Sequence, residues 1–194
     1  MVLGKLAMWH FPVTTLGPGD RLGIWFQGCD KNCKGCETPE FRRIVPLSDC
    51  REELDGIFDF VRNNKVDGLT ISGGEPFLQP DVLWYVGRRF REIQLDKGIK
   101  PDIRVYTGRL YEELVKSAQY RKILQEITVL IDGPYIKELD MGSPIKGSEN
   151  QRVLILDKTI DEPFRTDARR SGEIVWNDYV GRFVYIGLKQ KERS

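Results

Sequence analysis

The chain has 194 residues, of which 40% are hydrophobic and 30% charged, a composition typical of a globular domain rather than a disordered one. Its 30 lysines and arginines nearly balance its 29 aspartates and glutamates, which argues against a protein that wraps nucleic acid. A complete eight-stranded (β/α) barrel takes about 250 residues, so a barrel in this chain would be incomplete. We expect a single domain over residues 1–194.

The amino-terminal residues do not resemble a targeting segment. The first twelve hold only a short apolar stretch, which His10 and Pro12 interrupt, without a small-residue cleavage site. No run in the sequence approaches the roughly 20 apolar residues that a membrane span requires. We therefore expect a cytoplasmic protein that has neither a membrane nor a nucleic acid as its partner.

Strands and helices are predicted to alternate through the first two thirds of the chain. The predicted strands, which are apolar and end in glycine or polar residues, are 21–27, 68–72, 103–106 and 127–131. This alternation predicts parallel strands covered by helices, an α/β fold.

The predicted helices between these strands have apolar residues at helical spacing. The first begins at residue 48 or 49, where Asp49 and Glu52 would form a capping box. The second begins at Asp81, and the third covers 110–125 with a break near Gln119. Each of these helices would return the chain to the start of the next parallel strand.

Four loops follow the carboxyl ends of the predicted strands. They begin near Cys29, Ser72, Tyr106 and Asp132. Ligands of parallel sheets bind at the carboxyl ends of the strands, so we expect these loops to meet at one rim and to form the functional site.

The last third of the chain departs from this alternation. A polar, glycine-rich loop is predicted over 140–150, followed by a strand over 151–156. The segment after Asp161 is charged and irregular. A final pair of strands is predicted over 174–176 and 181–186.

Three of the four cysteines lie within eight residues, Cys29, Cys33 and Cys36, at the spacing C-x3-C-x2-C. Disulfides are disfavoured because we expect a reducing compartment and because a chain of this length forms an adequate core without them. Structural zinc and ferredoxin clusters usually take four protein ligands, whereas three thiolates leave one coordination position open. An iron–sulfur site with one free iron, a zinc site and unrelated core cysteines all remain open on spacing alone. Cys50 and His10 have no neighbour typical of a zinc knuckle.

Two motifs together resemble those of the radical S-adenosylmethionine (SAM) enzymes. The cysteine motif follows the first strand, and Gly73-Gly74-Glu75-Pro76 follows the second, with a helix between them. Within that superfamily the chain resembles the glycyl radical activases, in the subgroup that activates anaerobic ribonucleoside-triphosphate reductases. The stretches that carry this closer resemblance are 17–21, 25–29, 33–36, 72–76, 106–108, 132–135 and 147–152.

The resemblance implies a fold, a reaction and partners. The fold would be an incomplete (β/α) barrel of mostly parallel strands with flanking helices. Cys29, Cys33 and Cys36 would hold a [4Fe-4S] cluster whose open iron binds SAM, and Cys50 would not be a ligand. Reductive cleavage of SAM would give a 5′-deoxyadenosyl radical, which removes a hydrogen atom from a glycine of the large subunit of the partner anaerobic ribonucleotide reductase. A flavodoxin-like protein would supply the electron.

The resemblance also implies a set of residues that contact SAM. Around the third cysteine and after the second, third and fourth strands, these are Gly35, Glu37, Ser72, Gly73, Gly74, Glu75, Pro76, Tyr106, Thr107 and Asp132. Many members of the superfamily have an aromatic residue where this chain has Gly35. Asn150, Gln151 and Arg152 match the subgroup without an assigned role.

Structural roles compete with several of these interpretations. Gly73-Gly74 is also typical of a plain tight turn, Tyr106 of a packed aromatic, and Asp132 of a turn aspartate before Gly133-Pro134.

Two other functions remain alternatives. One is radical chemistry on another glycyl radical enzyme, a peptide or a small molecule, and the other is a non-catalytic zinc or iron–sulfur module.

Overall fold

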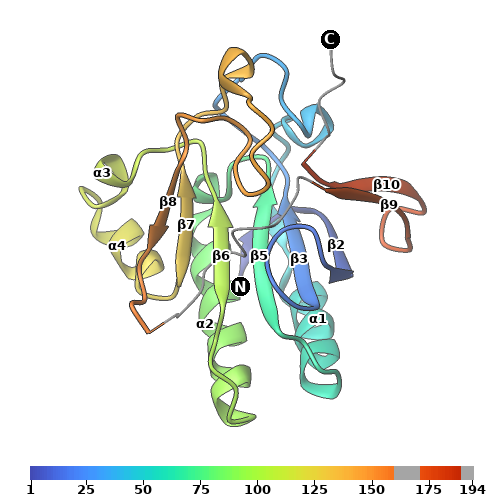
Figure 1. The fold of residues 1–194 in the computed structure, drawn as a ribbon. Helices are drawn as coiled ribbons and strands as arrows, with labels where there is room; N and C mark the ends of the chain where they lie inside the picture. Colours follow the sequence, from blue (N-terminus) through green and yellow to red (C-terminus); the bar gives the residue numbers. More distant parts are fainter. Residues whose placement is uncertain (160–170, 189–194) are drawn as a thin grey trace.

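Six strands form the central sheet of the computed structural model, which describes residues 1–159 and 171–188 (Figure 1). Their order is β2-β3-β5-β6-β7-β8. The four middle strands, which run parallel, are β3 (Arg21–Phe26), β5 (Gly68–Gly73), β6 (Ile103–Tyr106) and β7 (Val129–Asp132). The edge strands β2 (Leu6–Val13) and β8 (Arg152–Ile155) are antiparallel to their neighbours. The prediction of a mostly parallel α/β fold is confirmed, and within the described residues the sheet is open rather than a closed barrel.

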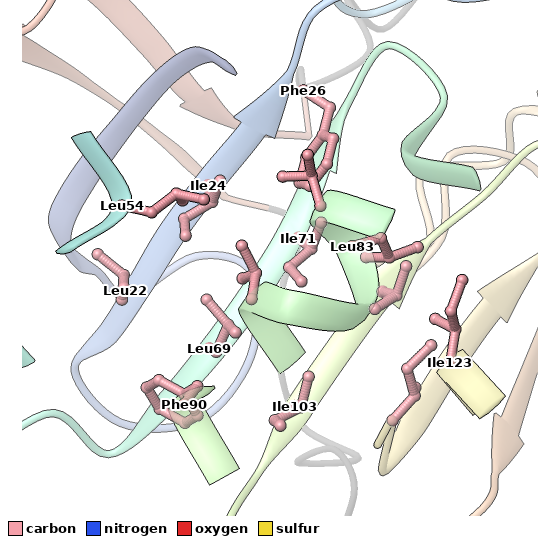
Figure 2. Packing of buried hydrophobic residues seen from close by; sticks show 14 of the residues in the cluster. Leu22, Ile24, Phe26, Leu54, Leu69, Ile71, Leu83, Phe90, Ile103 and Ile123 are labelled. Carbon is pink, nitrogen blue, oxygen red and sulfur yellow. The ribbon is translucent and has the colours of Figure 1, made fainter. Parts of the chain in front are cut away.

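Two long helices cover one face of this sheet, α1 (Arg51–Asn63) and α2 (Pro80–Asp96). Side chains alternate along a strand, so every second residue of β3 faces the helices. Figure 2 shows Leu22, Ile24 and Phe26 beside Leu69 and Ile71 of β5 in this core. The helices contribute the apolar faces read from the sequence; the buried residues are Leu54, Ile57, Phe58 and Val61 of α1 and Val82, Leu83, Val86, Phe90 and Ile93 of α2. Even α2, the longest helix of the described residues at 17 residues, lacks the length and apolarity that a bilayer crossing requires.

The first helix begins later than the sequence predicted. Cys50 is the residue that precedes α1, and Asp49 belongs to the short strand β4 (Ser48–Asp49), which pairs with β1 (Leu3–Gly4). The Asp49 carboxylate accepts the Val2 amide at 3.1 Å and the Arg51 amide at 3.2 Å. The predicted capping box is therefore wrong, because a partner from the amino terminus takes the Asp49 side chain.

The third predicted helix, over 110–125, is two short helices, α3 (Tyr111–Leu114) and α4 (Ala118–Leu124). Ser117 interrupts the pattern, since its side chain accepts the Tyr120 amide and caps α4. The break thus lies two residues before the predicted position.

Strand β2 was not predicted from the sequence. Its proline and histidine break the apolar pattern, yet it pairs antiparallel with β3 from Leu6↔Phe26 to Val13↔Arg21, with irregular register on both sides of the middle. An edge strand tolerates proline because one of its edges needs no ladder bonds. Local sequence could not reveal a strand whose stability depends on its neighbour.

The final pair of strands is confirmed as a hairpin, β9 (Gly172–Asn177) and β10 (Arg182–Gly187), which forms a sheet of its own beside β2. The side-chain amide of Asn177 donates to the Trp9 carbonyl at 2.7 Å. The predicted irregular segment after Asp161 lies outside the described residues.

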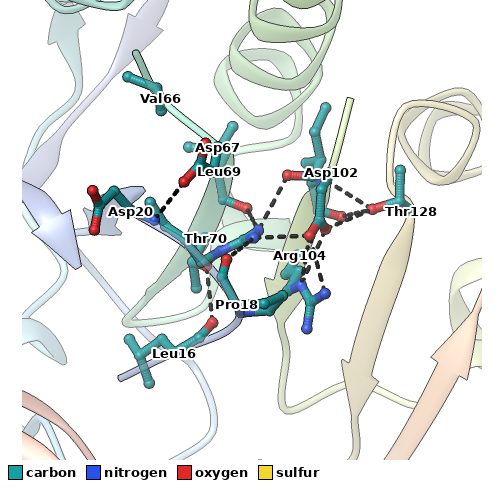
Figure 3. Close-up of polar contacts among 12 residues, drawn as sticks. Leu16, Pro18, Asp20, Val66, Asp67, Leu69, Thr70, Asp102, Arg104 and Thr128 are labelled. Atoms are coloured by element: carbon teal, nitrogen blue, oxygen red, sulfur yellow. Dashed lines mark hydrogen bonds and ion pairs between the residues drawn. The ribbon is translucent and has the colours of Figure 1, made fainter. Parts of the chain in front are cut away.

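A buried polar network lies on the sheet face opposite the helices (Figure 3). The Arg21 guanidinium bonds Asp102 at 2.8 Å and Thr70 at 2.7 Å, and Arg104 bonds the same carboxylate at 3.0 Å. Burial alone would raise the pKa of Asp102, but the two guanidiniums outweigh it and lower that pKa. The Thr70 hydroxyl also donates to the Leu16 carbonyl at 3.0 Å. Since Arg21 also donates to the Pro18 carbonyl, the network holds loop 14–20 against this face of the sheet.

Candidate functional site

The carboxyl ends of β3, β5, β6 and β7 border one open cavity. Of the residues predicted as ligands or SAM contacts, those that line it are Cys29, Cys33, Cys36, Glu37, Ser72, Gly73, Gly74, Glu75, Tyr106 and Thr107. The prediction that the four strand-end loops meet at one rim is confirmed. Gly35, Pro76 and Asp132 do not line this cavity.

The three motif cysteines are free and half-buried, and they share this cavity. Burial raises the pKa of the Cys29 thiol, and the Lys31 amide, which donates to its Sγ at 3.4 Å, opposes that rise. As placed, no three His, Cys, Asp or Glu side chains within residues 1–159 and 171–188 surround a common metal position. The donor set nevertheless fits an iron–sulfur cluster, since three thiols on one short loop face one cavity.

Cys50 lies apart from these thiols. It is buried in the core beneath α1, and its Sγ donates to the Val2 carbonyl at 3.2 Å. These contacts pack the amino terminus against the start of α1, and Cys50 is not among the residues that line the cavity.

The Gly73-Gly74 turn is pressed against the start of the cysteine loop. A side-chain carbon on Gly73 would lie 2.3 Å from the Phe26 nitrogen, and one on Gly74 would lie 2.1 Å from the Gly28 oxygen. Gly73 also has a φ of +110°, which favours glycine. The glycines are thus required by the chain's own backbone, and the turn they make holds the cysteine loop beside β5.

Glu75 is fully buried behind this turn. Its Oε1 accepts the Thr107 hydroxyl at 2.8 Å and the Phe77 amide at 3.0 Å, and its Oε2 accepts the Gly108 amide at 2.8 Å. Burial raises the pKa of this carboxyl, and the three hydrogen bonds oppose the rise. Its carboxylate therefore joins the loops after β5 and β6.

Tyr106 both packs and lines the cavity. Its hydroxyl donates to the Ile145 carbonyl at 2.9 Å, and burial raises its pKa to about 12. The tyrosine thus stays neutral at physiological pH and fixes the loop over 140–150 against the rim.

Asp132 lies behind the rim rather than on it. Its carboxylate is fully buried, accepts the Tyr111 amide at 2.7 Å and the Arg152 Nε at 2.9 Å, and forms an ion pair with that arginine. Arg152 also bonds both oxygens of Glu112, at 2.9 and 2.8 Å. Asp132 and Arg152 thereby join β7, β8 and α3.

The two residues that precede Arg152, Asn150 and Gln151, hold the loop after β7 in place through hydrogen bonds. The Gln151 side-chain Oε1 accepts the backbone amides of Gly147 and Ser148, and its Nε2 donates to the Gly133 carbonyl. Asn150 donates to the Pro134 carbonyl at 2.8 Å. Of the three residues without an assigned role, Gln151 lines the cavity, and Asn150 holds the loop after β7 beside it.

Several known proteins are similar in sequence to this chain. Residues 15–154 match the family model described as a 4Fe-4S single cluster domain. A protein of Haemophilus influenzae named anaerobic ribonucleoside-triphosphate reductase-activating protein is 36% identical over 154 residues, which cover 74% of this chain and 94% of that protein. Proteins of the same name from Escherichia coli K12, 31% identical with the same shares, and from bacteriophage T4, 27% identical over 71% of this chain and 85% of the phage protein, also match.

The chain belongs to the family of anaerobic ribonucleoside-triphosphate reductase-activating proteins. The family model includes all three motif cysteines and the Gly73–Pro76 stretch, and it ends before the hairpin of β9 and β10.

Several cavity residues were not predicted as contacts. They are Lys31, Thr38, Gly108, Gly133, Tyr135, Gly147, Gln151 and Leu188. Five of them, from Gly108 to Gln151, lie within stretches that carried the resemblance to this family, so that signal was available. Leu188, after β10, had no sequence signal, because only the tertiary fold brings it to the cavity.

Proposed function

We propose that this chain is a radical SAM activase of an anaerobic ribonucleotide reductase. Cys29, Cys33 and Cys36 would hold a [4Fe-4S] cluster, SAM would occupy the cavity beside them, and the product would be a glycyl radical on the reductase. The observation that carries this proposal is that three free thiols share one cavity with Gly73, Gly74 and Glu75. The names of the relatives indicate the same partner.

The chain's own residues would bind SAM and orient it in the cavity. When bound, a reduced cluster supplies the electron that cleaves SAM. The backbone of Gly73 and Gly74 would pair with the methionine part of SAM, and Glu37, Ser72, Tyr106 and Thr107 would contact the rest. Glu75 would act by holding Thr107 and Gly108 in place, since its oxygens already accept from both. Gly35, Pro76 and Asp132 stay predictions that the cavity lining does not support.

The open sheet supports the proposal of an incomplete radical SAM-type barrel within one domain over residues 1–194. An incomplete barrel would leave the rim open to a loop of another protein rather than enclose a small metabolite. In this proposal the protein works in the cytoplasm with a flavodoxin-like electron donor, and without a membrane or nucleic acid partner.

Cysteine variants test the ligand set. Anaerobic reconstitution of the wild-type chain should give about four irons per chain, the content of one cluster. Cys29→Ala, Cys33→Ala and Cys36→Ala should each lose most of this iron and form no 5′-deoxyadenosine from SAM and reductant. The matched control is Cys50→Ala, which should retain both. Equal loss in all four variants would overturn the ligand set.

The partner is tested by electron paramagnetic resonance. A mixture of the activase, SAM, reductant and the reductase of the same organism should develop a glycyl radical signal. SAM cleavage without that signal would redirect the proposal to another target. Bound zinc without a reducible cluster would end it.

A further inference from the structure

The hairpin of β9 and β10 has one buried face and one solvent face. Val175, Val184 and Ile186 pack against the cluster that contains Met8 and Val13 of β2. Asn177 adds its hydrogen bond to the Trp9 carbonyl. The hairpin is therefore held on the central sheet although it lies outside the family model, which ends at residue 154.

The opposite face of the hairpin is apolar and exposed. Its residues alternate with the packed ones and have exposed fractions of 73% for Ile174, 51% for Trp176, 68% for Phe183 and 38% for Tyr185. The register places them as cross-strand pairs, Phe183 opposite Trp176 and Tyr185 opposite Ile174. The Trp176 and Phe183 rings meet edge to face at 5.3 Å. Contiguous apolar patches with aromatic residues are typical of protein interaction surfaces.

This face, hereafter the hairpin face (Ile174, Trp176, Phe183 and Tyr185), is continuous with the cavity. Tyr185, Gly187 and Leu188 line a smaller hollow together with Ser72 and Tyr106, and Leu188 also lines the main cavity. A polypeptide segment that entered the cavity along this wall would lie against β10. The protein that carries the segment would then cover the hairpin face.

We propose that the hairpin face is a docking surface for the partner reductase, whose apolar surface beside its radical-bearing glycine segment would cover it. This inference rests on the proposed function, which requires a protein to reach the cavity. The four side chains of the face carry no charge, so its chemistry fits an apolar protein surface better than a phosphate backbone. Its continuity with the cavity favours the protein substrate over a second copy of this chain.

A pair of matched charge substitutions tests the proposal in the full-length, cluster-loaded chain. Ile174→Lys places a charge on the hairpin face without removing the Trp176–Phe183 pair. Leu95→Lys makes the same change at a residue that is 59% exposed near the carboxyl end of α2, away from the cavity. Binding to the reductase is measured by surface plasmon resonance under anaerobic conditions. Ile174→Lys should raise Kd at least about tenfold, as for a central interface residue, whereas Leu95→Lys should leave Kd within about twofold.

A double variant gives the larger change. Trp176→Thr with Phe183→Thr removes both aromatic anchors while keeping residues that favour strands. It should raise Kd further than Ile174→Lys does. If the double variant loosens the hairpin, the Ile174→Lys comparison decides alone, since that change leaves the cross-strand aromatic pair in place.

The outcomes separate the docking proposal from the proposed function. SAM cleavage in the absence of reductase should be the same in the wild type and in Ile174→Lys. A wild-type chain that forms the glycyl radical, together with an Ile174→Lys variant of unchanged Kd, would overturn the docking proposal alone. A wild-type chain that cleaves no SAM would overturn the proposed function. A wild-type dimer that Ile174→Lys dissociates without change in reductase binding would assign the face to a second copy and overturn the docking proposal.

Discussion

At the scale of single residues, Glu75 joins two strand-end loops through one buried carboxylate. In a Glu75→Gln variant an NH2 group replaces one carboxylate oxygen. It would then face a backbone N–H, of Phe77 or of Gly108, and two donors cannot form a hydrogen bond. We expect the free energy of unfolding to fall by about 1–3 kcal/mol, as for a buried hydrogen-bond group left unpaired. Urea denaturation measures this change. Glu52→Gln, on the exposed first turn of α1, is the control and should cost about 0.5 kcal/mol or less. Equal effects of the two variants would show that the hydrogen bonds of Glu75 do not stabilise the loops after β5 and β6.

Glu112 makes a second prediction at this scale, one that depends on pH. Its bonds to Arg152 lower its pKa from 4.5 to about 2. A depressed carboxyl pKa stabilises the fold above the unfolded value and loses that effect as pH falls through the folded value. Glu112→Gln should therefore be less stable than the wild type at pH 7, and at pH 3.5 the difference should be smaller but still present. Convergence of the two urea midpoints already at pH 3.5 would show an ordinary, unpaired glutamate.

At the scale of elements, the turn after β5 and the cysteine loop are packed backbone against backbone. Gly74→Ala would place a carbon 2.1 Å from the Gly28 oxygen, and backbone cannot rotate away as a side chain can. We expect a loss of about 1–3 kcal/mol, typical of overpacking, and a lower iron content after reconstitution. The control is Gly56→Ala in α1, where nothing lies within 4 Å of the added carbon. That change should stabilise the chain by about 0.5–1 kcal/mol. Unfolding midpoints and iron analysis distinguish the two.

The same scale shows what the sequence could predict. Strands β3, β5, β6 and β7 and the apolar faces of α1 and α2 were predictable because burial between layers leaves a periodic signal. Strand β2 was not, because its pairing with β3 outweighs the unfavourable local pattern around Pro12. The start of α1 was misplaced because Val2, far away in sequence, takes the Asp49 side chain.

At the scale of the whole molecule, the hydrophobic core and the cavity are separate. The main cluster of buried residues includes none of the three motif cysteines. We therefore expect removal of iron by an anaerobic chelator to leave the far-ultraviolet circular dichroism unchanged and the urea transition cooperative. This differs from small metal-dependent domains, which unfold without their metal. Loss of the cooperative transition on chelation would show that the cluster is part of the core.

The site was predictable at this scale to the extent that parallel strands bring their carboxyl ends together. This property of parallel sheets predicted where the cavity lies. It could not predict which of the residues at the strand ends line the cavity and which are buried behind it. Asp132 ends its strand as predicted, yet its carboxylate lies away from the cavity and pairs with Arg152. The wall made by Leu188 depends on how the last hairpin folds back, which no local pattern records.

The order of the elements along the chain is also the order in which they leave the ribosome during synthesis. Ribosomes release the amino-terminal part first, and the central sheet is complete once β8 has emerged at Ile155. All three motif cysteines and the Gly73–Pro76 turn precede Ile155 in the chain, whereas β9 and β10 follow it and emerge later. On the nascent chain the cavity is consequently wider on the side that Tyr185, Gly187 and Leu188 later border.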